Sequence, residues 1–143
     1  MASPPLTNRE YAYFTVRGKG SHLFVSKKLG VESTNEWSEG DINPHNNRSR
    51  RFMAWNLESG LDDTHPIEEH IEKILILIEP LKDKLDELTQ GYDLTIQCVG
   101  YFAGTGHGLH LNRETIKRIS GLSVAIDYDY YFIDDHGHDL DYV

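Results

Sequence analysis

Two sets of side chains alternate with a period of two in three segments of the chain, and a fourth segment is an apolar run. Such alternation is typical of β-strands, because successive side chains of a strand point to opposite faces of the sheet. The aromatic and β-branched residues in these segments also favour strands. We therefore predict four strands over residues Glu10–Arg17, Arg51–Leu57, Leu94–Tyr101 and Val124–Tyr130.

A longer apolar stripe recurs at spacings of four and three residues between Ile67 and Leu88. This spacing places the apolar side chains on one side of an α-helix, so we predict a long core helix. Pro66 suits its first turn. Pro80 lacks a backbone N–H and should kink the helix or split it in two. His70 lies beside the stripe, and we expect it to bond the preceding loop rather than to act as a base.

Capping residues mark two shorter helices. Ser21 can cap a helix that ends at Leu29, with Gly30 in the position that favours a left-handed residue. Asn112 can cap a second helix, which Gly121 ends.

The remaining segments show no helical period. Val31–Ser49 is polar and is predicted to be a long ordered loop. Gly104, Gly106 and Gly108 predict a reversal into a short strand over Leu109–Leu111, which would form a hairpin with the strand before it.

The element order is therefore strand, helix, strand, helix, strand, strand, helix, strand. This order predicts an α+β fold, a two-layer sandwich in which helices cover one face of a mostly antiparallel sheet of about five strands. We expect a single domain, with its core at about residues 10–132 and flexible ends at 1–8 and 133–143.

Composition limits the classes of function. The chain has 143 residues and one cysteine, Cys98, which lies in an apolar run and is expected to be a small buried hydrophobe. The lack of a disulfide pair, a signal peptide or a membrane span predicts a cytoplasmic protein. Because 23 acidic residues outnumber 14 basic ones, the formal charge is −9, which disfavours nucleic acid as a partner.

Several short runs form a recognisable set when their order and spacing are taken together. They are Leu29–Thr34, Trp37, Gly40, Trp55, Glu69, His70, Gln97–Phe102, Gly108–Leu111 and Ile126–Tyr130. This set resembles a bacterial family known as domain of unknown function 4279, over about Tyr11 to Tyr131. The resemblance implies a small cytosolic α+β domain, and it supplies no catalytic residue.

Three polar residues are candidates for a site on the open face of the sheet. Asp127 and Asp129 alternate with inward residues on the last strand, and His110 alternates in the same way between Leu109 and Leu111. If the two strands are neighbours, the three side chains share a face. They would then form a divalent-metal site or an acid–base set, or simply the polar surface that water covers.

The polar loop supplies a second group of candidates. Trp37 is an amphipathic anchor either for a partner or for packing the loop onto the sheet, whereas Trp55 is expected in the core. Arg48, Arg50 and Arg51 form a local basic cluster, which is either a binding surface for an acidic group or a solvated turn.

No catalytic triad, paired-cysteine metal motif or nucleotide fingerprint is present. The leading hypothesis is therefore a non-enzymatic protein-interaction module without a cofactor, for example an immunity-type inhibitor of a toxin. The interaction surface would include Trp37, the arginine cluster, His110, Asp127 and Asp129. The alternative is a metal-binding protein or metal-dependent enzyme that uses His110, Asp127 and Asp129. A third option is a homodimer formed through the sheet.

Overall fold

The computed structural model describes residues 7–104 and 108–133. The described chain forms one mixed sheet of five strands with helices packed on one side, which confirms the α+β prediction. Its elements are β1 (Arg9–Gly18), α1 (His22–Leu29), β2 (Asn35–Trp37), β3 (Met53–Glu58), α2 (Ile67–Ile78), the 3₁₀-helix η1 (Glu79–Leu81), α3 (Lys82–Leu88), β4 (Asp93–Ala103), α4 (Arg113–Ser120) and β5 (Ala125–Ile133).

The strands lie in the order β2-β3-β1-β4-β5. Within the described residues, β1 pairs antiparallel with both β3 and β4, and β2 pairs antiparallel with β3. The pairing of β4 with β5 is parallel. The sheet is therefore mostly antiparallel, as predicted, with one parallel edge strand.

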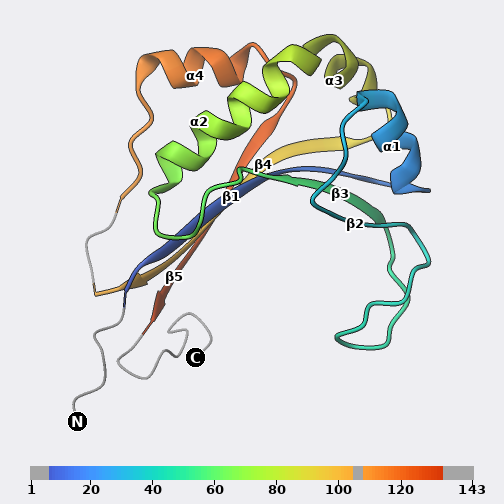
Figure 1. Ribbon diagram of the computed structural model, residues 1–143, viewed down its shortest axis with the longest axis horizontal. Coiled ribbons are helices and arrows are strands. Elements are labelled where there is room, and N and C mark those ends of the chain that lie inside the picture. Colours follow the sequence, from blue (N-terminus) through green and yellow to red (C-terminus); the bar gives the residue numbers. More distant parts are fainter. Residues whose placement is uncertain (1–6, 105–107, 134–143) are drawn as a thin grey trace.

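The predicted hairpin strand over Leu109–Leu111 is wrong. Residues 108–112 adopt no regular structure and lead from β4 to α4 (Figure 1). The reason is topological: two parallel strands cannot be joined by a tight turn, so the chain must cross over the sheet before β5 can begin. The fifth strand is instead β2, which lies inside the segment that the polar pattern assigned to a loop.

The helix predictions are confirmed in detail. The Ser21 side chain accepts a hydrogen bond from the backbone N–H of Leu23, and Gly30 ends α1 with a φ of 69°. The Asn112 side chain caps α4 by accepting from the N–H of Thr115 at 2.8 Å. Pro80 lies in the 3₁₀ turn that separates α2 from α3, so the long apolar stripe is divided between two helices.

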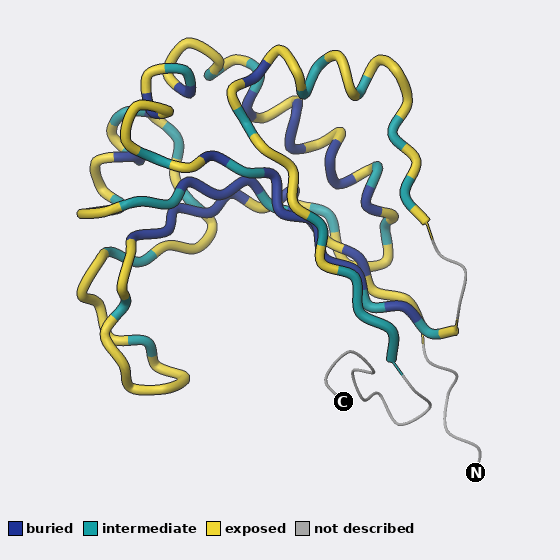
Figure 2. The backbone as a smooth tube through the Cα atoms, turned by 180° about the vertical axis from the view of Figure 1, so that it is seen from behind, coloured by how far each residue is buried: buried dark blue, intermediate teal, exposed yellow. Residues whose placement is uncertain are grey.

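All four α-helices lie on the same side of the sheet (Figure 1). Burial is concentrated in the central strands and on the sheet-facing side of α2, whereas the segment that follows β2 is exposed (Figure 2). Residues 134–143, where we expected a flexible tail, lie outside the described residues, but Ile133 still belongs to β5.

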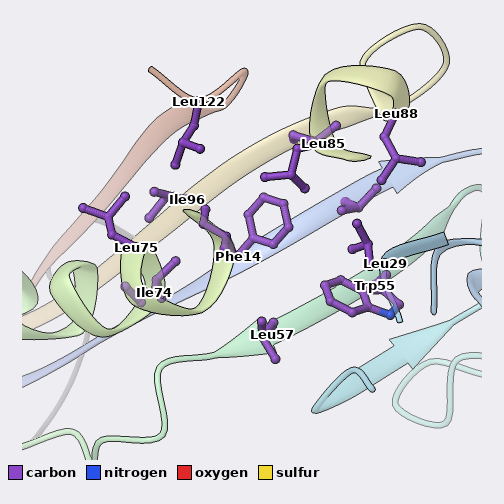
Figure 3. Packing of buried hydrophobic residues seen from close by; sticks show 14 of the residues in the cluster. Phe14, Leu29, Trp55, Leu57, Ile74, Leu75, Leu85, Leu88, Ile96 and Leu122 are labelled. Atoms are coloured by element: carbon purple, nitrogen blue, oxygen red, sulfur yellow. The ribbon is translucent and has the colours of Figure 1, made fainter. Parts of the chain in front are cut away.

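The core fills the space between the helices and the sheet. The side chains of Phe14, Trp55, Ile74, Leu85 and Ile96 converge there from three strands and two helices (Figure 3). Phe14 and Trp55 meet edge to face at 6.2 Å between ring centroids. The Trp55 indole N–H donates to the Ser26 hydroxyl at 2.9 Å, so this tryptophan belongs to the core, as predicted.

Candidate functional site

The second face of the sheet is the strongest candidate for a functional surface. The described residues place no helix on it, and we call it the uncovered face (Figure 1). Side chains of aligned residues in neighbouring strands point to the same face, so the register defines its membership. It comprises Asn35 and Trp37 of β2; Ala54, Asn56 and Glu58 of β3; Arg9, Tyr11, Tyr13, Thr15 and Arg17 of β1; Asp93, Thr95, Gln97, Val99 and Tyr101 of β4; and Ala125, Asp127, Asp129 and Tyr131 of β5.

Tyrosines form two stacked pairs on this face. The rings of Tyr11 and Tyr13 on β1 are 6.4 Å apart between centroids. Tyr101 of β4 and Tyr131 of β5 stack at 5.1 Å, and the Arg9 guanidinium lies 4.6 Å from the centre of the Tyr101 ring. Partial burial, reinforced by neighbouring Tyr101 and Tyr13, raises the pKa of Tyr11 to about 12. Its hydroxyl therefore remains a neutral donor and acceptor.

The centre of the uncovered face is polar. A hollow of about 340 Å³ lies across β1, β4 and β5, and its lining includes Thr15, Arg17, Gln97 and Asp127. The Gln97 amide donates to Asp129 Oδ2 at 2.9 Å, which links β4 to the edge strand β5. A partner that reaches this hollow would meet both hydrogen-bond donors and acceptors.

Asp127 and Asp129 lie together on the uncovered face, as the alternation along the last strand indicated. His110 does not join them. It lies in the connection after β4, where its backbone N–H donates to Glu68 Oε1 on α2 at 3.2 Å, on the helical side of the sheet. Within residues 7–104 and 108–133, no three histidine, cysteine or acidic side chains are grouped closely enough to hold a metal ion.

The structure brings Trp37 and the arginine cluster together, although they lie more than ten residues apart. The Arg50 guanidinium stacks on the Trp37 ring at 3.8 Å. The indole N–H of Trp37 donates to the carbonyl of Phe52 at 3.1 Å, so the half-buried ring also packs the loop onto the sheet. Arg48, Arg50 and Arg51 line one cavity with Trp37.

His70 and Ser59 form a buried polar pair on the helical side. Ser59 Oγ lies 2.6 Å from His70 Nδ1, and it also accepts from the backbone N–H of Leu61 at 3.2 Å. Burial lowers the pKa of His70, so the neutral imidazole is favoured. The pair fastens the loop between β3 and α2, which is the role the sequence suggested for His70.

Nothing in the sequence singles out the tyrosines of the uncovered face. Its alternation separates Tyr11 and Tyr13 from Phe14, but aromatic residues occur on both faces of the strands. The stacking of Tyr101 on Tyr131 depends on the parallel pairing of β4 with β5. No local sequence pattern predicts that pairing.

No helix in the described part of the chain has the length and apolar character needed to cross a membrane. A family model described as a domain of unknown function (DUF4279) matches residues 8–133, which is nearly the whole chain. Searches of curated proteins and of solved structures gave no match. The chain therefore belongs to the DUF4279 family, and the resemblance inferred from the short runs is confirmed.

Proposed function

We propose that this member of the DUF4279 family is a non-enzymatic protein-interaction module. Its uncovered face would bind a basic, partly apolar surface of another protein. The observation that carries the proposal is the composition of this face, where tyrosine, tryptophan and arginine side chains gather without a covering helix in the described chain. These residue types are enriched at the centres of protein interfaces.

The aromatic side chains suit a role as anchors. Tyr11 is 37% exposed, and its stacking on Tyr13 restricts the motion of both rings. A restrained ring loses little conformational entropy when a partner covers it, while its hydroxyl still forms hydrogen bonds. The Tyr101–Tyr131 stack offers a second rigid contact on the same face.

The acidic residues of the edge strand favour a basic partner. Asp127 and Asp129 are exposed on β5, and neither forms an ion pair within the described residues. The formal charge of the whole chain is −9. Such a charge accelerates the approach of a basic surface and suppresses association with acidic ones. An inhibitor that occupies the basic cleft of an enzyme is one form of this function.

The test compares three forms of the tagged protein in extracts of its own cells after nuclease treatment. The first is the unchanged chain, and the second carries Asp127→Lys and Asp129→Lys. The third carries Asp83→Lys and Glu114→Lys, which make the same charge change on α3 and α4. We expect a stoichiometric protein partner with the first and third forms, and we expect the second to bind the purified partner at least about tenfold more weakly.

Equal binding by all three forms would refute the assignment to the uncovered face. A parallel extract is prepared without nuclease. Recovery of nucleic acid alone from that extract, or of only a second copy of the chain from either extract, would refute the proposed class of partner. Thermal unfolding of each variant provides the control for folding.

A further inference from the structure

The loop between β2 and β3 borders an open cavity at one end of the sheet. Its volume is about 230 Å³, and its lining includes Arg48, Arg50 and Arg51. Among the described residues, no carboxylate contributes to this lining. In a chain whose formal charge is −9, three arginines lining one cavity are a local reversal of sign.

The arginines that line this cavity have no acidic partner among the described residues. Within the described residues, none of the three arginines forms an ion pair. Arg50 instead stacks on Trp37, and its Nε is buried without a hydrogen-bond partner in the described structure. An unpaired guanidinium that is partly withdrawn from water is stabilised when an anion binds nearby.

Two asparagines add further donors to the lining. Asn43 Oδ1 accepts from the backbone N–H of His45 at 3.0 Å, and Asn46 Oδ1 accepts from the N–H of Arg48 at 3.0 Å. These bonds occupy the amide oxygens and fix the orientation of both amides, so the NH₂ groups are the parts left to meet a ligand. The cavity is therefore rich in donors and poor in acceptors.

The backbone of the loop is held in place before any ligand arrives. Ile42 and Ser49 form an isolated antiparallel bridge, and the N–H of Asn43 donates to the carbonyl of Arg48 at 2.8 Å. Asn47 adopts a left-handed conformation with a φ of 59°, which asparagine tolerates better than most residues. A preformed loop reduces the entropy lost on binding.

We propose that this cavity is a binding site for a phosphate monoester, with Arg48 and Arg51 contacting the phosphate oxygens and the stacked Arg50 supplying further positive charge. Guanidinium groups match phosphate oxygens in geometry, and several of them together favour a dianion over a single carboxylate. The cavity is larger than the phosphate group itself, so it leaves room for the first atoms of the attached group. This site does not depend on the function proposed for the uncovered face.

Titration calorimetry and intrinsic tryptophan fluorescence test the site with inorganic phosphate, free phosphoserine and a short phosphoserine peptide, at constant ionic strength set with chloride. We expect saturable binding, and we expect Arg48→Gln and Arg51→Gln each to weaken it about tenfold. Arg113→Gln is the matched control, because it removes the same charge from an exposed position on α4. The affinity of the Arg113→Gln variant for each phosphate ligand should stay within about twofold of that of the unchanged chain.

The three ligands also identify the source of the phosphate. Equal affinities for the free and peptide forms indicate a small phosphate ester, whereas tighter binding of the peptide indicates a phosphorylated protein segment. The proposal is overturned if no ligand binds saturably, or if Arg113→Gln weakens binding as much as Arg48→Gln does. The variant that carries both Asp127→Lys and Asp129→Lys should bind phosphate at least as tightly as the unchanged chain does. The phosphate site and the uncovered face are therefore tested independently.

Discussion

Arg118 supplies side-chain hydrogen bonds that join α4 to α2 and η1, and its replacement tests how much these bonds stabilise the protein. The Arg118 side chain donates to both oxygens of Glu79 and to Glu72 Oε2 at 2.6 Å. No residue of α4 is fully buried. Ile119 packs against the core but is only partly buried, so the helix has limited apolar burial to hold it in place if these bonds are lost. We predict that Arg118→Met destabilises the protein although it preserves much of the apolar stem.

The magnitude follows from the exposure of the three side chains. Arg118 is 27% exposed, Glu79 38% and Glu72 48%, so water screens the charges only in part. Exposed pairs contribute up to about 1 kcal/mol, and hydrogen bonds to charged groups contribute more. We expect a loss of about 1–2 kcal/mol in the free energy of unfolding. For a domain of this size, that loss lowers the melting temperature by about 3–6 °C.

Urea unfolding at low salt measures this loss, and Arg113→Met is the control because it removes the same charge from the same helix. The difference between the two variants should shrink as salt is added, since screening weakens the interactions of Arg118 with both carboxylates. A double-mutant cycle with Glu79→Gln isolates the pair itself. If Arg118→Met and Arg113→Met are equally stable at low salt, the attachment inferred from these contacts is refuted.

Three further predictions concern buried groups. Burial lowers the pKa of His70 from its ordinary value of 6.5. Just below that pH the folded state therefore binds fewer protons than the unfolded state, so the free energy of unfolding should fall as the pH is lowered from about 7 to 5. His70→Gln should flatten this dependence in urea unfolding at each pH, and an unchanged slope would contradict the assignment to His70. Burial, reinforced by the Asp127 and Glu68 carboxylates, raises the pKa of the Cys98 thiol to about 12. A thiol reagent at pH 8 should therefore modify Cys98 only after unfolding. Rapid labelling of the native protein would show the reasoning to be wrong. Gly100→Ala would press a methyl group against the Phe102 ring and should cost about 1–3 kcal/mol of stability, and calorimetry showing no loss would mean that the ring moves aside freely.

The sequence by itself determined the local elements and the faces they present. The apolar stripe from Ile67 to Leu88 predicted the helical segment and Pro80 predicted a kink or a break in it, because both signals act over a few residues; the structure shows the break. The alternation along the last strand placed Asp127 and Asp129 on one face, since successive side chains of a strand always point to opposite sides.

Only the tertiary structure decided which strands are neighbours and how they run. The hairpin predicted after β4 assumed that the next apolar residues would pair with it, whereas the chain crosses the helical side and returns as the parallel strand β5. Because of this crossover, His110 lies away from Asp127 and Asp129. The parallel pairing of β4 with β5 also brings Tyr101 and Tyr131 together. Asn35–Trp37 is too short to show a period and becomes a strand only because β3 offers it a partner. Periodicity records the face of a side chain, but strand pairing depends on distant segments that the local pattern does not describe.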